Sequence, residues 1–206
     1  MNACVNLPYV KQNFPRATAK HVVEIRHNDG IYRHLYCHDP DSFCSWFEIV
    51  TFPCVLVYNG DHGCYAFSRT NDMFEFFRNC HPNPEYWQEK LLDGRERVLK
   101  FSASELEKHV KDLFLDFYKE KSSFWSEEEK HDYFLEFEEE IISKCLFEET
   151  FKDLDYIELE SGFVFDPTEI DPRIFTNQFL FACCAIPWAI SKYDKQKSAS
   201  NKEQKQ

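Results

Sequence analysis

The segment Trp46–Arg78, WFEIVTFPCVLVYNGDHGCYAFSRTNDMFEFFR, constrains the fold more than any other part of the chain. Aromatic and β-branched residues fill three short runs, separated by Pro53 and by the turn sequence Gly60-Asp61-His62-Gly63. Such runs between turn residues are typical of consecutive β-strands. A phenylalanine-rich stretch after Asp72 has the spacing of a short helix. The segment therefore predicts three strands and a helix around a ring-rich core.

Two more strands are expected before this segment. They flank Asn28-Asp29-Gly30, whose Asp-Gly pair tolerates the positive φ angles of a tight hairpin turn. The five predicted strands are Lys20–His27, Ile31–Cys37, Phe43–Thr51, Cys54–Tyr58 and Cys64–Ser68. Short links between consecutive strands favour an antiparallel meander over residues 19–68. Residues 1–18, with Pro8 and Pro15, are expected to be irregular.

The rest of the chain is predicted to be helical. Apolar residues recur at helical spacing behind capping-box patterns at Ser104-x-x-Glu107 and Ser126-x-x-Glu129. Asp171-Pro172 is expected to open a last helix, which Pro187 should kink or split. The predicted fold class is α+β: a single domain over 1–206, in which helices from 70–195 cover one face of the five-stranded antiparallel meander. Residues 196–206 are expected to form a flexible tail.

Thr70 or Asn71 is expected to cap the helix that ends near Arg78. In the longer helices, the predicted inward-facing residues are Leu106, Val110, Leu113 and Phe117, and then Tyr133, Phe134, Phe137, Ile141 and Cys145.

Nine cysteines raise the question of disulfide bonds. The number is odd, no Cys-x-x-Cys spacing occurs, and the first residues lack the apolar run of a secretory signal. We therefore expect reduced, mostly buried thiols and a cytoplasmic location. The longest apolar run, Phe179–Ile190, has 12 residues and contains a proline, so we expect a buried helix and no membrane span.

Negative charge is concentrated in the middle of the chain. The net charge is −12, and residues 101–171 carry 22 acidic and only 7 basic residues. The acidic candidates for partner binding are Asp112, Asp116, Glu127, Glu128, Glu136 and Glu139. A row of carboxylates on helices can imitate a phosphate backbone and occupy a basic groove on another protein. The alternative is a solvated face that keeps a ring-rich protein soluble. Direct contact with nucleic acid is not expected.

Metal binding is considered because two Cys-His pairs occur, at Cys37-His38 and Cys80-His81, with Cys44, Cys54 and Cys64 between them. The gaps between these residues are not the short chelating spacings that zinc sites use. We therefore predict structural thiols, no metal and no cofactor.

Four residues near the Gly60–Gly63 turn and the aromatic helix are candidate binding residues, namely Asp61, His62, Arg69 and Arg78. Asp61 also suits a turn, because its carboxylate can accept local backbone hydrogen bonds. Arg78 also suits the C-terminus of a helix. Glu48 lies within a strand, and if it were buried it would need a partner such as Arg69 or Arg33. Cys64 follows His62 closely enough to share a face with it.

The central block resembles small proteins encoded by tailed-phage genomes and prophages. The pattern comprises Trp46-Phe47, Thr51, Pro53, Gly60-Asp61-x-Gly63, Phe67-Ser68-Arg69, Asp72-Met73-Phe74-x-Phe76-Phe77-Arg78, Tyr86-Trp87, Glu89-Lys90 and the run from Ala185 to Asp194. The chain departs from it at Glu48, Cys54 and His62, where Asp, Gly and Met are expected. The resemblance implies a phage or prophage accessory protein in the bacterial cytoplasm, and it supplies no catalytic residue.

The sequence thus favours a non-enzymatic interaction protein, whose partner would be a host or phage protein such as a basic nucleic-acid-binding or defence protein. The alternative is a small hydrolase or nuclease that uses carboxylate or histidine residues near the Gly60–Gly63 turn. A third hypothesis is a structural or regulatory homodimer, joined through an exposed aromatic face such as Tyr65 and Phe67. An enzyme would require these ionisable groups to converge in a pocket.

Overall fold

The computed structural model describes residues 2–78 and 80–203, without the side chains of 201–203. Two compact units make up the chain. Unit 1 comprises residues 1–2 and 101–174, and unit 2 comprises residues 3–100 and 175–206. The chain passes between them at β6 (Leu99–Phe101) and β9 (Arg173–Phe175), which form a two-stranded sheet. Each unit has its own hydrophobic core, whereas the sequence predicts one helical layer on one sheet.

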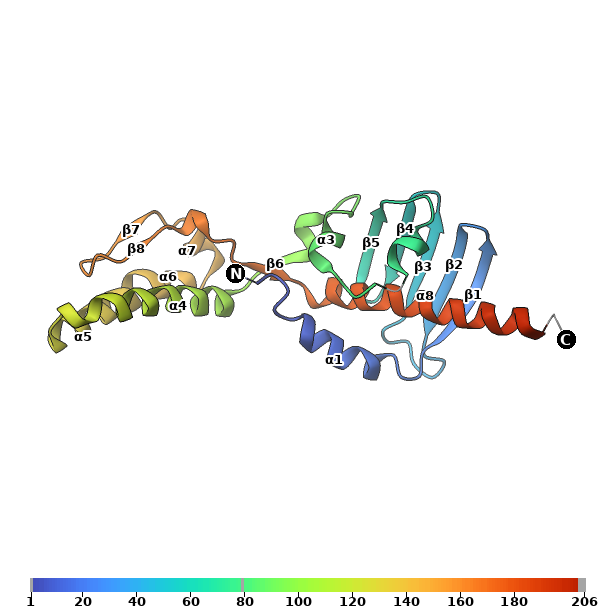
Figure 1. Cartoon of the computed structure of the whole chain (residues 1–206), viewed down its shortest axis with the longest axis horizontal. Coiled ribbons are helices and arrows are strands. Elements are labelled where there is room, and N and C mark those ends of the chain that lie inside the picture. Colours follow the sequence, from blue (N-terminus) through green and yellow to red (C-terminus); the bar gives the residue numbers. More distant parts are fainter. Residues whose placement is uncertain (1, 79, 204–206) are drawn as a thin grey trace. The chain divides into compact units, whose positions relative to one another are not determined.

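Unit 2 contains the predicted five-stranded antiparallel meander, which confirms the α+β class (Figure 1). Its strands are β1 (Val22–Asp29), β2 (Tyr32–His38), β3 (Phe47–Phe52), β4 (Val55–Gly60) and β5 (Gly63–Ser68). Each strand pairs with the next along the chain. A β-bulge interrupts β1, because the register of its pairing with β2 shifts between Ile25 and His27.

One face of the sheet is buried and the other is open. The buried face carries alternate residues of the strands, such as Leu35, Cys37, Phe47, Ile49, Leu56, Tyr58 and Phe67. Because Phe67 is fully buried, the expectation that it forms an exposed dimerisation face is wrong. The outer edge of β5 is also covered, since Ser68 N donates to Lys90 O and Leu92 N donates to Ala66 O. That contact protects an edge strand that could otherwise pair with another chain.

The described residues of unit 2 also form four helices, namely α1 (Leu7–Ala17), α2 (Met73–Phe77), α3 (Pro84–Gln88) and α8 (Asn177–Glu203), with a 3₁₀ turn at Arg95–Val98. The expectation of an irregular N-terminus is wrong, because α1 forms there. Pro8 lies in its first turn, where a missing N–H costs nothing. Burial of Val10 and Phe14 in the core of unit 2 stabilises this helix despite Pro15 inside it.

Helix α8 crosses the buried face of the sheet from β5 to β1 (Figure 1). Near its start the Phe179 ring packs against Tyr65 of β5, and further along the helix the Tyr193 hydroxyl donates to Asn28 of β1. The helix begins at Asn177, later than the predicted Asp171-Pro172, and Pro187 does not split it. It extends to Glu203, so most of the predicted tail is helical, and Gln196 Nε2 donates to Val23 O. Residues 204–206 lie outside the described residues.

Unit 1 is mainly helical and has a phenylalanine-rich core. Its elements are α4 (Ala103–Lys121), α5 (Glu127–Phe137), α6 (Ser143–Cys145), α7 (Glu148–Lys152), β7 (Ile157–Glu158) and β8 (Val164–Phe165), with 3₁₀ turns at Ser122–Phe124 and Pro167–Glu169 and a π-helical turn at Glu138–Ile142. Phe114 and Phe137 stack at the centre, with ring centroids 3.9 Å apart, and Phe163 packs edge-on against both.

The predicted helix starts are confirmed only in part. Ser126 and Glu129 form a complete capping box at the start of α5. The box predicted at Ser104 is wrong, because α4 already begins at Ala103, after Ser102. Of the predicted inner residues, Leu113 is 42% exposed and its neighbour Phe114 is buried instead. Phe134 of the second stripe is likewise exposed.

The tight turn between β3 and β4 yields a stability prediction. Cys54 adopts φ 67°, a left-handed conformation that favours glycine, and its N–H donates to Asn71 O. The resemblance expects glycine at this position. We expect Cys54→Gly to raise the free energy of unfolding by about 0.5–1 kcal/mol in urea denaturation, because it removes backbone strain and keeps the N–H. Cys64→Gly, within β5, should instead lower it by about 0.5–1 kcal/mol. Equal effects of both changes would contradict the strain argument.

Candidate functional site

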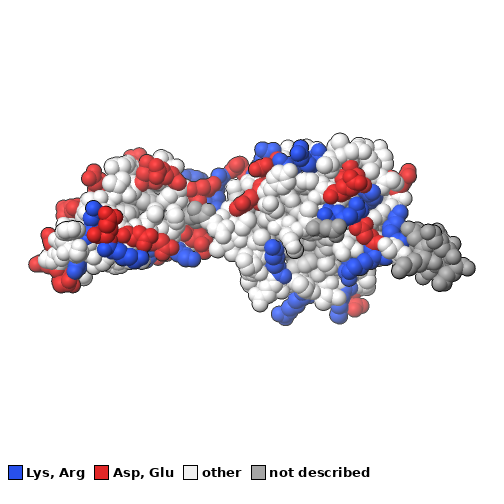
Figure 2. All heavy atoms as spheres, viewed as in Figure 1, with Lys and Arg blue, Asp and Glu red and all other residues white. Residues whose placement is uncertain are grey.

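Unit 1 holds the acidic excess of the whole chain. Its residues include 22 acidic and 8 basic side chains, a net charge of −14, whereas unit 2 has 14 acidic and 16 basic side chains, a net charge of +2. Figure 2 shows acidic side chains spread over the helices of this unit. A compact body with its own core therefore presents a strongly negative surface.

The acidic candidates do not form one uninterrupted row. Asp112, Glu128 and Glu139 are exposed. Asp116 and Glu127 are also exposed, but each forms an ion pair one turn away, with Lys119 at 2.8 Å and Lys130 at 2.6 Å. Both oxygens of the Glu136 carboxylate accept the Glu160 N–H, at 3.0 and 3.2 Å, so this residue anchors a turn.

A groove of about 440 Å³ lies between the outward faces of α4 and α5. It is lined by Phe114, Leu115 and Tyr118 of α4 and by Glu127, Lys130, His131 and Phe134 of α5. The α5 residues recur at intervals of three or four, which places them on one helix face. Leu115 and Phe134 are each 45% exposed, so the groove combines apolar walls with a charged rim on an acidic unit.

The Gly60–Gly63 turn is a structural connection between β4 and β5. The Asp61 carboxylate accepts the backbone N–H of Ser45, and Asp61 N donates to Trp46 O at 3.1 Å. Ser45 has φ 59°, so Asp61 holds the adjoining loop in a left-handed conformation. A Cβ on Gly60 would lie 2.4 Å from Trp46 O, which explains why glycine is required there. The Asp61 carboxylate therefore connects its turn to the loop before β3, a contact 16 residues away in the sequence that differs from the local turn bond expected for it.

His62 lies at a cavity of about 280 Å³ between α1 and the start of α8. Of the described residues that line this cavity, none carries an acidic or basic side chain other than His62 itself. The imidazole stacks on Phe181, with ring centroids 3.8 Å apart, and burial lowers its pKa. Its Nε2 atom is buried without a hydrogen-bond partner.

Glu48 lies on the open face of the sheet, where it bridges two strands. Its carboxylate accepts from Asn59 Nδ2 at 3.0 Å and lies 2.8 Å from His34 Nε2. Burial acts to raise the pKa of Glu48, but the hydrogen bonds from Asn59 and His34 outweigh it and the pKa is lowered. The partners suggested from the sequence, Arg69 and Arg33, are not the ones found. His34 was not among the predicted partners, although it lies on the same sheet face as Tyr36, the residue that pairs with Glu48 across β2 and β3.

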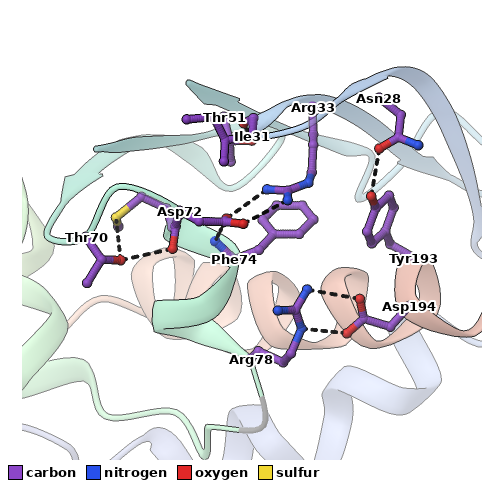
Figure 3. Close-up of polar contacts among 11 residues, drawn as sticks. Asn28, Ile31, Arg33, Thr51, Thr70, Asp72, Phe74, Arg78, Tyr193 and Asp194 are labelled. Carbon is purple, nitrogen blue, oxygen red and sulfur yellow. Dashed lines mark hydrogen bonds and ion pairs between the residues drawn. The ribbon is translucent and has the colours of Figure 1, made fainter. Parts of the chain in front are cut away.

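A buried ion pair connects the sheet to α2 (Figure 3). Both terminal nitrogens of Arg33 donate to the Asp72 carboxylate at 2.8 Å, and the guanidinium lies 4.5 Å from the centre of the Phe74 ring. Asp72 also caps α2 by accepting the Phe74 N–H, so the predicted caps Thr70 and Asn71 are wrong. The bonds from Arg33 lower the pKa of Asp72. The Arg33–Asp72 ion pair therefore holds α2 against the sheet.

The two arginines predicted as binding residues differ in their surroundings. Arg78 forms two hydrogen bonds with Asp194 of α8, at 2.9 and 3.2 Å, as Figure 3 shows, and these bonds raise its pKa. Arg78 therefore links α2 to α8. Arg69 is exposed at the end of β5. With Glu48 on the open face and Asp61 in a turn, the candidates for an active site do not gather in one pocket.

The nine cysteines are all free thiols. Four are buried, and burial raises the pKa of these thiols, to about 11 for Cys145 and Cys184. The expectation that most are buried is wrong, because Cys44, Cys54, Cys64 and Cys80 are exposed. Within residues 2–78 and 80–203, no group of three or more histidine, cysteine or acidic side chains could hold a metal ion.

Comparison with protein-family models, curated proteins and solved structures finds no match to this chain. Among the helices that the structure describes, none is long and apolar enough to span a bilayer.

Proposed function

We propose that the protein is a phage or prophage accessory protein that acts in the host cytoplasm by binding another protein through its acidic unit. The proposal rests on the uneven distribution of charge along the chain: unit 1 has a net charge of −14, whereas unit 2 has a net charge of +2. The negative electrostatic field of unit 1 attracts a partner with a basic surface and increases its rate of association.

The class of partner follows from the same charge. Proteins that bind nucleic acid present clustered Lys and Arg side chains to phosphates. Carboxylates on the exposed faces of α4 and α5 supply the opposite sign at helical spacing. The proposed partner is therefore a basic nucleic-acid-binding or defence protein of the host, whose binding groove the acidic unit would occupy.

The proposal is tested with the full chain as bait in capture from a bacterial host lysate. The test variant combines Asp112→Asn, Glu128→Gln and Glu139→Gln, three exposed carboxylates of unit 1. The matched control combines Asp29→Asn, Glu75→Gln and Asp93→Asn, three exposed carboxylates of unit 2 with the same charge change. We expect a basic partner whose recovery falls several-fold with the first variant only. Equal recovery with both variants, or no partner at low salt, would refute the proposal.

A further inference from the structure

The groove between α4 and α5 has the chemistry of a receptor for a helix. Its floor is the buried ring of Phe114, and its walls are Leu115, Tyr118 and Phe134. Two apolar walls that are each about half exposed cost free energy in water unless something covers them. The lining residues come from two neighbouring helices, and apolar grooves of this kind can receive an amphipathic helix.

The surroundings of the groove decide the charge of its occupant. Glu127 lies on the rim, and Glu128 follows it at the start of α5. On α4, Asp112 precedes Leu115 by three residues and Asp116 follows it directly, and Lys119, four residues after Leu115, pairs with Asp116 at 2.8 Å, so the negative charge around the groove comes from the net charge of the unit. Lys130 and His131 also line the groove, and the Lys130 Nζ is 2.6 Å from the Glu127 carboxylate.

We infer that this groove binds a basic amphipathic helix of the partner, with apolar side chains against Phe114 and Phe134 and Lys or Arg side chains on the acidic rim. The inference rests on the proposed function and identifies the part of unit 1 that does the binding. A second copy of the same unit is a poor occupant, since two bodies of net charge −14 repel each other.

The experiment uses the full chain and synthetic peptides of about 18 residues, roughly five helical turns. The first peptide places Leu on one helix face and Lys on the other. The second has the same composition, with Leu dispersed around the helix. Fluorescence anisotropy measures the affinity of each peptide. We expect the amphipathic peptide to bind at least about tenfold more tightly than the dispersed one, and to weaken as salt increases.

A groove variant and a control variant test whether the amphipathic peptide binds in the groove. Leu115→Ser combined with Phe134→Ser should weaken binding of the amphipathic peptide by about tenfold or more. Phe124→Ser is the matched control, because Phe124 is 82% exposed in the same unit and does not line the groove. Circular dichroism and thermal unfolding verify that all variants remain folded. We expect the control to bind like the unmodified chain.

The outcomes separate the two proposals. If both basic peptides bind equally and the groove variant has no effect, the groove inference is refuted and the acidic surface remains the binding element. If neither basic peptide binds at low salt, the groove inference is refuted together with the electrostatic basis of the proposed function. Self-association of the chain that the groove variant abolishes, without peptide binding, would assign the groove to a second copy and also refute the inference.

Discussion

Asp72→Ala is expected to lower the free energy of unfolding by about 3–5 kcal/mol. Arg33 is 8% exposed, and its guanidinium would keep its charge without the carboxylate that now accepts both terminal nitrogens. An uncompensated buried charge is costly because the surrounding protein solvates it poorly. The change also removes the cap of α2, which accounts for about 0.5–2 kcal/mol within the expected total. Urea denaturation followed by circular dichroism measures the loss.

The matched control is Asp194→Ala, which removes the partner of Arg78. That pair has similar geometry, but its side chains are 33% and 37% exposed. Solvent screens such a pair, so a loss of about 1 kcal/mol or less is expected. If the two variants lost the same stability, burial would not be the reason for the importance of the Arg33–Asp72 pair.

The same pair predicts how stability depends on pH. Arg33 lowers the pKa of Asp72 in the folded state, while the unfolded value is about 3.9. The stabilisation from the Asp72 carboxylate is therefore complete above about pH 4 and is lost as the pH falls through the folded pKa. Consequently, the difference in unfolding free energy between the unmodified chain and Asp72→Ala should shrink in acid and remain constant between pH 5 and 7, roughly. A constant difference down to acid pH would contradict this assignment.

Sequence patterns predicted the sheet well because turns and alternation are local signals. Pro53 and the Gly60–Gly63 turn delimited β4 and β5, and the face shared by Leu35 and Cys37 is buried as the period of two requires. Arg33 lies on that same face, so its burial was readable from the alternation. The carboxylate that pairs with Arg33 could not be predicted in this way, because Asp72 is 39 residues away and its position fits an ordinary acidic residue in the first turn of a helix.

Long-range packing accounts for most of the sequence predictions that differ from the structure. Proline signals suggested an irregular N-terminus, but contacts of Val10 and Phe14 with the core of unit 2 stabilise α1. The sequence patterns also did not predict the groove between α4 and α5. The apolar spacing in these helices indicated that Leu113 and Phe134 face inward, whereas Phe114 is buried in the core and Phe134 is exposed. Which side of a strongly apolar helix is buried depends on its neighbours, and the sequence pattern alone does not specify them.

Phe137→Ala is expected to lower the free energy of unfolding of unit 1 by about 3–5 kcal/mol. The Phe137 side chain is 1% exposed and stacks on Phe114 at 3.9 Å, so its removal leaves a cavity at the centre of that core. Native-state hydrogen exchange locates the loss. We expect the amides of α4 and α5 to lose protection while those of the central strands β2–β4 keep theirs.

The control for this change is Phe134→Ala, three residues earlier on the same helix. Phe134 is 45% exposed, so the expected cost is about 1 kcal/mol or less. Among the residues that the structure describes, no buried residue belongs to both cores, and this is the reason to expect separate responses. If Phe137→Ala exposed the amides of the sheet to the same extent, the two units would unfold together. The chain would then behave as the single domain that its sequence suggests, and the acidic unit could not be treated as an independent binding body.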